Sequence, residues 1–205
     1  MRDSSATRAK LLSAAVAVFS ETGYSGATTR AIAERAGVNE VTLFRHFGAK
    51  ADLLVQAMAT EAEKFMPEAI RFTGDLEADL VRLVTGYKEF AQTRARFVVT
   101  VLSDVPRFPE LRAAADTPKK FIGAAAAVIV RYQQAGALRA EPPVVVAASL
   151  LAPVLLLAFA RHAAPELASA TLIDPGEHVR RFLNGHAAAP AAAAPKRAKT
   201  RAKRT

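Results

Sequence analysis

The sequence contains no cysteine and no tryptophan, and aromatic residues make up only 7% of its 205 positions. The absence of cysteine excludes disulfides, thiol catalysis and cysteine-ligated zinc, and it suits a reducing cytoplasm. Ten glycines and eleven prolines are too few for a fibrous or wholly disordered chain. Apolar residues are abundant at 51%, mainly Ala, Val and Leu, which favours closely packed helices over an aromatic-rich sheet.

Positive charge is confined to the two ends of the sequence. The formal net charge is +9, and residues 1–50 hold seven Lys and Arg against four Asp and Glu. Residues 51–189 are neutral overall, whereas residues 190–205 hold six basic residues and no acidic one. A polyanionic partner, either nucleic acid or an anionic membrane surface, is therefore expected to meet the ends of the chain.

One apolar run, residues 144–160, has the composition of a membrane span. It holds no charge and one polar residue, Ser149, but it is near the lower length limit and contains Pro153. A buried or interface helix of a soluble protein has the same composition. We expect such a helix and no membrane association, because the sequence holds only one run of this kind. Polar and charged residues at positions 2–5 also predict that no secretory signal is present.

Apolar residues recur at helical spacing along most of the chain, and no stretch shows the alternation typical of strands. The sequence therefore predicts an all-α fold of about nine helices. Glycine, proline and capping residues set their expected limits. The expected helical segments are 7–19, 30–36, 40–47, 50–66, 76–94, 97–102, 118–135, 142–162 and 174–184.

Two of these segments, 30–36 and 40–47, have the pattern of a helix-turn-helix unit. Ala33 is small where the helices would cross, Gly37 permits a tight turn, and Leu43 would pack the second helix onto the first. Two such short helices cannot bury themselves, so the helix at 7–19 must pack across both. An ordinary αα-hairpin is the alternative, and the spacing, helix caps and basic charge make it less favoured.

The segment ATTRAIAERAGVNEVTLFRHFGAKADLL resembles the signature of the TetR family, and the resemblance covers about residues 7–60. It implies operator binding as a homodimer, and effector binding that usually releases the DNA, so that most such proteins are repressors. It also implies a helix-turn-helix DNA-binding domain (residues 1–50) and a helical ligand-binding and dimerisation domain (51–186). The Ala, Pro, Lys and Arg composition of residues 187–205 predicts a disordered basic tail.

The resemblance assigns DNA contacts to the start of the second helix, to the first turn of the recognition helix and to flanking phosphate-binding positions. Val41 is expected to contact a thymine methyl group. Glu40 either accepts from cytosine N4 or serves as a first-turn acid that complements the helix dipole, and we favour the second role. The candidate DNA-binding residues are Thr28, Thr29, Arg30, Asn39, Glu40, Val41, Thr42, Phe44, Arg45, His46 and Lys50.

Two positions depart from the family pattern. Phe44 stands where the family usually has a tyrosine that bonds a phosphate, so it contributes only packing and apolar contact. Ala49 stands where Ser or Asn usually caps the next helix, and a lost cap costs about 1 kcal/mol. Leu43 and Phe47 are assigned to the core. The basic tail is expected to add salt-sensitive, sequence-independent attraction to DNA; the alternative is that it mainly aids solubility.

The second domain is expected to bind a small and fairly lipophilic effector. Its net charge is zero and its helices carry scattered aromatic residues, some of which should line a pocket. By resemblance, a homodimer forms through helices 142–162 and 174–184, and the apolar run then meets its copy in the partner. The candidate ligand-binding residues are Phe65, Tyr87, Phe90, Phe97, Thr100, Phe121 and Phe159.

An enzyme is not expected, because the sequence has no Gly-rich phosphate loop, no GxSxG and no HExxH. No cofactor is expected, and His178 and His186, eight residues apart, are only a weak metal signal. Two functions compete with the favoured hypothesis. The first is an architectural DNA-binding protein that acts mainly through its basic tail, and the second is a membrane-associated protein. The favoured hypothesis is a cytoplasmic, ligand-responsive transcriptional regulator that binds a palindromic operator.

Overall fold

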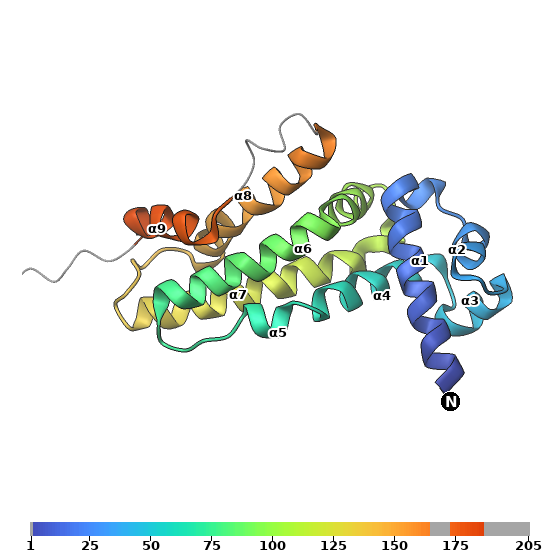
Figure 1. Ribbon diagram of the computed structural model, residues 1–205, viewed down its shortest axis with the longest axis horizontal. Coiled ribbons are helices and arrows are strands. Elements are labelled where there is room, and N and C mark those ends of the chain that lie inside the picture. Colours follow the sequence, from blue (N-terminus) through green and yellow to red (C-terminus); the bar gives the residue numbers. More distant parts are fainter. Residues whose placement is uncertain (1, 165–172, 187–205) are drawn as a thin grey trace, which may run out of the picture.

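The computed structural model describes residues 2–164 and 173–186, and within these residues the regular elements are all helices joined by loops, as the sequence predicts. The tail expected over residues 187–205 lies outside the described part of the chain. Figure 1 shows α2 and α3 at one end of an elongated molecule and α9 at the other. The elements are α1 (Arg2–Gly26), α2 (Thr29–Ala36), α3 (Glu40–Phe47), α4 (Lys50–Glu63), α5 (Met66–Ala69), α6 (Leu76–Asp104), η1 (Pro109–Ala115), α7 (Asp116–Gln134), α8 (Pro143–Ala163) and α9 (Pro175–His186).

The helix-turn-helix unit forms because each boundary residue satisfies backbone groups at a helix end. The Thr28 hydroxyl oxygen accepts a hydrogen bond from the amide of Ala31 at 3.0 Å, which caps α2. The Asn39 side-chain oxygen accepts from the amide of Val41 at 2.9 Å, which caps α3. Gly37 ends α2 with φ at 69°, a left-handed conformation in which a side chain would be strained. These local contacts confirm both predicted helices.

The first hydrophobic core fixes the orientation of α3. It is built from α1 to α4, η1 and the C-terminal part of α6. Phe19, Ile32 and Leu43, one each from α1, α2 and α3, are 0% exposed, and Phe47 is 5% exposed. Each side chain of this size contributes about 1.5–3 kcal/mol when fully buried. The core assignment of Leu43 and Phe47 is therefore confirmed.

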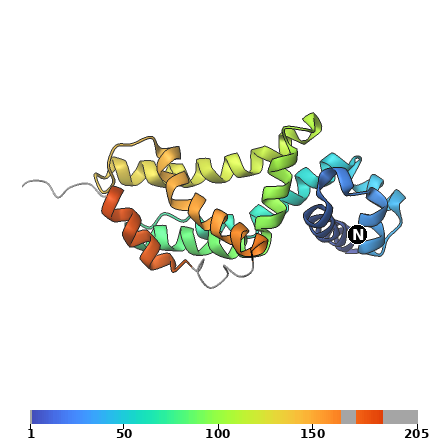
Figure 2. The ribbon, with the colours of Figure 1, turned by 90° about the horizontal axis from the view of Figure 1, so that it is seen from above.

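The second hydrophobic core lies between α5, α6, α7, α8 and α9. Ile129 of α7, Leu150 of α8 and Val179 of α9 are each 0% exposed. The two views in Figures 1 and 2 show α6, α7 and α8 packed together along the body. Because α6 contributes to both cores, it connects the body directly to the helix-turn-helix end of the molecule.

The helix expected over 50–66 is shorter than predicted, because α4 ends at Glu63 and a separate helix, α5, begins at Met66. Pro67 gives the physical reason. In a continuous helix its ring would collide with the carbonyl of Glu63, four residues earlier. In the first turn of α5 the proline lacks only an amide that would have no helical partner.

Other helix boundaries also differ from the expectation. The segments 76–94 and 97–102 form one helix, α6, since no glycine or proline separates them. The first helix is longer than 7–19, and Gly23, with φ at 69°, breaks its last part. The 3-10 helix η1 was not predicted, and α9 continues past the expected stop at Asn184 to His186.

Candidate nucleic-acid interface and effector cavity

The short helix α3 has a buried face and an exposed face that carries apolar side chains. Leu43 and Phe47 fill the first core, whereas Val41 is 73% exposed and Phe44 is 46% exposed. A single exposed apolar side chain is common, but Val41 and Phe44 lie three positions apart on one face of α3 and form a small apolar patch. The first turn of α3 therefore presents Val41 as an apolar contact point, at the position from which such helices reach base edges.

Thr29 and Glu40 bind each other across the turn between α2 and α3. The Thr29 hydroxyl donates a hydrogen bond to Glu40 Oε1, with 2.5 Å between the oxygens. This bond joins the first turn of α2 to the first turn of α3. A carboxylate engaged in this way is held close to the α3 N-terminus, which fits the role of a first-turn acid that we favoured over a base contact.

Thr28 and Asn39 use their side-chain oxygens as helix caps, and each retains a hydrogen-bond donor for an outside partner. Arg30 pairs with Glu34 at 2.9 Å on the exposed surface of α2. Such an exposed pair contributes little stability, so the guanidinium can exchange this partner for a phosphate. The predicted contacts of these residues with DNA stay predictions.

The ammonium group of Lys50 has intramolecular partners that the sequence did not indicate. Its Nζ donates to the carbonyls of Tyr24 at 2.8 Å and Ala27 at 2.9 Å, and it lies 4.1 Å from the Tyr24 ring centroid. Burial lowers the pKa of Lys50, and the nearby Glu110 carboxylate opposes that shift. Lys50 therefore holds the turn between α1 and α2, whether or not it also contacts phosphate.

Three further candidates lie on α3, one polar and two basic. Arg45 is exposed, and Thr42 and His46 are half-buried. The His46 Nε2 atom is buried and has no hydrogen-bond partner among the described residues. An unpaired buried nitrogen of this kind is unfavourable in a folded protein.

A contact between α6 and the break in α1 was missed by sequence reasoning. Asp104 Oδ2 accepts a hydrogen bond from the amide of Tyr24 at 2.8 Å, directly after Gly23. The Tyr24 ring also packs edge-on against Phe108, with centroids 5.0 Å apart. The two glycines at 23 and 26 mark the end of the helix, but no local signal pairs residues 80 positions apart. This contact ties the body to the helix-turn-helix unit.

The body contains a small aromatic cavity between α4, α6 and α7. Its volume is about 60 Å³, well below the roughly 300–1,000 Å³ of typical ligand sites. Four of the seven candidate ligand-binding residues line it: Phe65, Tyr87, Phe90 and Phe121. The full lining is Met58, Ala62, Phe65, Tyr87, Phe90, Val98, Thr117, Pro118, Phe121 and Ile122.

The other three candidates do not line this cavity. Phe97 is 1% exposed within the first core. Thr100 lies beside Gly23, where its Cγ2 would be 3.7 Å from a Cβ added to that glycine. Phe159 is half-buried on α8. Helical periodicity identified them as apolar or inward positions but could not assign them to one of two cores.

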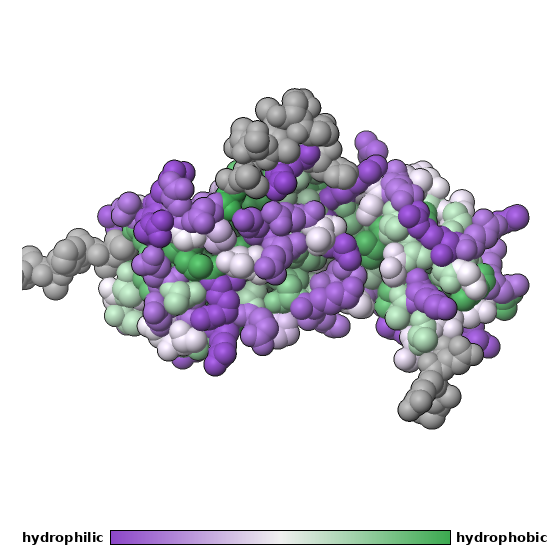
Figure 3. Space-filling view, in the orientation of Figure 1, coloured by the Kyte–Doolittle hydropathy of each residue, from purple (hydrophilic) through white to green (hydrophobic). Residues whose placement is uncertain are grey.

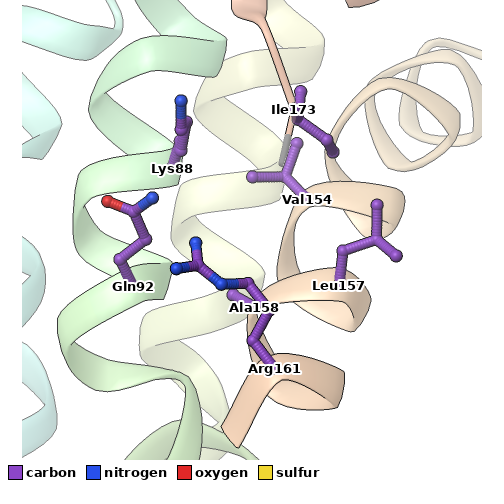
Figure 4. Close-up of a pocket in the computed structure, with 7 residues that line it drawn as sticks. All are labelled: Lys88, Gln92, Val154, Leu157, Ala158, Arg161 and Ile173. Atoms are coloured by element: carbon purple, nitrogen blue, oxygen red, sulfur yellow. The ribbon is translucent and has the colours of Figure 1, made fainter. Parts of the chain in front are cut away.

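A second hollow lies between α6 and α8 and is more polar. Figure 4 shows Lys88 and Gln92 on α6 facing Arg161 on α8, with Val154 and Leu157 on the α8 side. Its volume is about 10 Å³, which is no more than the space of one water molecule. This hollow is too small for an effector.

The helix α8 exposes apolar side chains along its length. Val144, Val145 and Leu156 are 54%, 61% and 66% exposed, and in Figure 3 apolar residues reach the surface over α8. Only 28% of the segment Pro143–Arg161 is buried, and it is the one helix in the described chain that is long and apolar enough to span a membrane. The same face suits a copy of itself in a second chain.

Comparison with known proteins gives a consistent result. Residues 11–57 match the family described as bacterial regulatory proteins, tetR family. The transcriptional repressor KstR of Rhodococcus jostii is 31% identical over 109 residues. That alignment covers 53% of this chain and 51% of KstR, so the chain spans about half the length of this curated relative.

Solved structures share the fold over most of the chain. A chain from Shewanella sp. PV-4, described as a tetR family transcription regulator, matches with a TM-score of 0.68 and 22% identity. The match covers 89% of this chain and 99% of that one. SmeT in complex with triclosan matches with a TM-score of 0.66 and 22% identity, over 89% and 92% of the two chains. Residues 11–57 thus match the helix-turn-helix sequence of the tetR family, and the chain shares its helical fold with these solved structures.

Proposed function

We propose that this protein is a sequence-specific DNA-binding transcriptional repressor that releases its operator when a small, fairly lipophilic effector binds the body. The observation that carries the proposal is the first turn of α3, where Val41 is 73% exposed on a helix anchored by buried Leu43 and Phe47. Related proteins support the two halves of the proposal separately. KstR is named a repressor, and SmeT was solved with triclosan.

In this proposal α3 enters the major groove and its first turn reads the bases. Val41 contacts a thymine methyl group, and Thr42 bonds a base or a phosphate. Phe44 adds apolar contact in place of the hydroxyl that a tyrosine would supply. Arg45 neutralises a phosphate and His46 contacts one, while Glu40 stays bound to Thr29 and orients α3.

The operator is proposed to be palindromic because a homodimer presents two recognition helices. The partner contact uses residues 142–162 and 174–184, where Val144, Val145 and Leu156 expose apolar surface. Two half-sites in successive major grooves require the recognition helices to be about 34–36 Å apart. Residues 1–50 then form the DNA-binding domain and residues 51–186 the effector and dimer domain of a cytoplasmic protein.

The helix α4 is the proposed link between effector and DNA. Leu53, Leu54 and Ala57 of α4 are 0% exposed in the first core, so this helix moves with the helix-turn-helix unit. Its last turn is held to α6 by an ion pair between Glu61 and Arg94, with 2.5 Å between the two atoms. A shift of α4 at that end would change the separation of the two recognition helices.

Operator selection tests the proposal against an architectural role. Random duplexes are enriched on the full-length protein and on a variant that ends at Ala189, at near-physiological salt with excess competitor DNA, and are then sequenced. We expect both proteins to select the same palindromic consensus, with the tail changing only the affinity. If no consensus emerges and binding requires residues 190–205, the protein is an architectural DNA binder.

A size measurement in the absence of detergent tests the membrane-associated function. Sedimentation of the purified protein is expected to give a dimer, because the apolar face of α8 is covered by its copy. Material that sediments as a dimer only in detergent, or that partitions into vesicles, would instead identify Pro143–Arg161 as a membrane segment.

A further inference from the structure

Phe65 inserts its ring into the aromatic cavity from the short connection between α4 and α5. The ring is stacked on Phe90, with centroids 4.4 Å apart and planes inclined by 21°. It also contacts Phe121, with centroids 5.2 Å apart. Phe90 belongs to α6 and Phe121 to α7, so a ring from a third segment occupies the space between two helices.

Phe65 lines both the cavity and a groove on the surface. The groove has a volume of about 360 Å³ and is lined by polar and charged residues of α5 and α6, among them Glu68, Arg82 and Glu89. Phe65 is the only residue that lines both spaces. Phe65 therefore lies where the cavity and the groove adjoin.

The other aromatic residues of the cavity present flat ring faces. Tyr87 and Phe121 are stacked with centroids 5.0 Å apart and planes inclined by only 11°. No charged residue lines the cavity, and an unpaired charge in such a place is strongly unfavourable. Burial raises the pKa of Tyr87 to about 12, so its hydroxyl is neutral at physiological pH. This hydroxyl forms no hydrogen bond with any described residue, so it can serve a ligand.

We propose that this cavity binds an uncharged, flat aromatic molecule with one hydrogen-bonding group, which enters by displacing the Phe65 ring and takes its place between Phe90 and Phe121. The Phe65 ring thus fills the binding site when no ligand is bound. The regulatory consequence rests on the proposed function, whereas the site itself does not.

The position of Phe65 in the chain connects its ring to α4. The residue follows the end of α4 at Glu63 by two positions. The last turn of α4 is held by Glu61, which pairs with both Arg94 and Lys64 at 2.5 Å. Only two positions separate Phe65 from the end of α4, so displacement of the ring is expected to shift the last turn of α4 and to strain the ion pairs of Glu61.

Fluorescence titration of the full-length protein with 2-naphthol tests the site. The chain contains no tryptophan, so protein emission does not interfere with naphthol fluorescence. The probe is flat, uncharged at pH 7 and carries one hydroxyl. The matched probe 2-naphthoate has the same rings with a negative charge, and cyclohexanol, as a competitor of 2-naphthol, has a hydroxyl without aromatic rings.

We expect 2-naphthol to bind the wild-type protein at least about tenfold more tightly than 2-naphthoate, and cyclohexanol not to displace it. Phe65→Ala removes the ring and should raise the affinity for 2-naphthol by about tenfold. Phe72→Ala is the matched control, because Phe72 packs on Tyr132, with centroids 4.9 Å apart, and does not line the cavity. It should leave the affinity within about twofold. Tyr87→Phe should weaken 2-naphthol by about three- to tenfold without weakening naphthalene.

Equal binding of 2-naphthoate, or an unchanged affinity in Phe65→Ala, overturns the proposal. If Phe65→Ala does not fold, Phe65→Leu replaces it with an expected gain of about threefold, and the comparison of the two probes on the wild type stands by itself. Operator binding, measured in parallel, separates the two proposals. If the protein binds an operator but not 2-naphthol, only the proposed binding site is refuted. If it binds 2-naphthol in a manner that depends on Phe65 but binds no operator, only the proposed regulatory function is refuted.

Discussion

A buried carboxylate at the start of α6 gives a sharp test of how the body is held together. Asp79 is 2% exposed and its carboxylate accepts four hydrogen bonds. Two come from Thr73, from the amide and from the hydroxyl, each at 2.6 Å. The others come from the Tyr132 hydroxyl of α7 at 2.5 Å and from Arg82 at 2.8 Å. This group therefore links the α5–α6 connection to α6 and α7.

We predict that Asp79→Ala lowers the free energy of unfolding by about 3–5 kcal/mol at pH 7, because the buried Tyr132 hydroxyl and the Thr73 amide lose their acceptor. The matched control is Asp75→Ala, which removes the exposed side-chain cap of the same helix, bonded to the amide of Ala78 at 3.0 Å. That change should lower the free energy of unfolding by only about 1 kcal/mol.

The same carboxylate predicts a pH dependence of definite sign. Burial alone raises the pKa of Asp79, but the hydrogen bonds from Thr73, Tyr132 and Arg82 outweigh it and hold the pKa well below its usual value. A depressed pKa stabilises the fold above the unfolded-state pKa of about 3.9, and the contribution is lost as the pH falls below it. The difference between wild type and Asp79→Ala should therefore be about 1 kcal/mol smaller at pH 3 than at pH 7.

Urea unfolding followed by helical circular dichroism measures both effects, at one fixed protein concentration because dimerisation adds to apparent stability. A loss below about 1 kcal/mol at pH 7 in Asp79→Ala, or a difference that grows toward pH 3, would show that the four hydrogen bonds do not stabilise the charged carboxylate.

Three further predictions concern the helix-turn-helix unit and the exposed face of α8. Ala49→Ser supplies the cap that α4 lacks and should raise the free energy of unfolding by about 0.5–1 kcal/mol in the same urea assay; an unchanged midpoint would contradict it. Arg45→Ala should weaken DNA binding and reduce the slope of log affinity against log salt by about 1, with an unchanged thermal midpoint, and an unchanged slope would exclude a phosphate contact. Leu156→Lys should convert the dimer to a monomer in sedimentation, whereas Val41→Lys, on a similarly exposed apolar residue of α3, should leave the dimer intact.

The helix-turn-helix unit could be predicted from the sequence because its determinants are local. Thr28 and Asn39 lie within three residues of the amides that they cap, and Gly37 marks the turn between the helices. The burial of Leu43 and Phe47 follows from the same spacing. The sequence also predicts that Ala49 cannot cap α4, and in the structure α4 has no side-chain cap.

The contacts that join the two parts of the molecule could not be predicted, because they link residues far apart in the chain. Nothing near Asp104 indicates the amide of Tyr24, and nothing near Glu61 indicates Arg94. Lys50 was expected on the DNA side from its family position, yet its ammonium group also satisfies two backbone carbonyls. Sequence patterns show which residues are charged, but not which distant group neutralises them.

The sequence predicted the aromatic residues that line the cavity, but not where in the body the cavity lies. Of the aromatic candidates, Phe65, Tyr87, Phe90 and Phe121 line the cavity, whereas Phe97 lies in the other core. Pro67 ends α4 at Glu63, and this break allows the Phe65 ring to enter the aromatic stack. The predicted helix over 50–66 had no such break, so it did not indicate this position of the ring.

The central claim is that the first turn of α3 reads a specific DNA sequence, and paired operator selections test it most directly. Full-length wild type, Val41→Ala and the control Val144→Ala, whose side chain is exposed on α8, are each incubated with random duplexes and the bound fraction is sequenced. The account predicts one palindromic consensus for wild type and Val144→Ala, and in Val41→Ala a relaxed preference at one symmetric pair of positions, with the rest of the consensus unchanged. An identical consensus in all three proteins, or none in any, would contradict it.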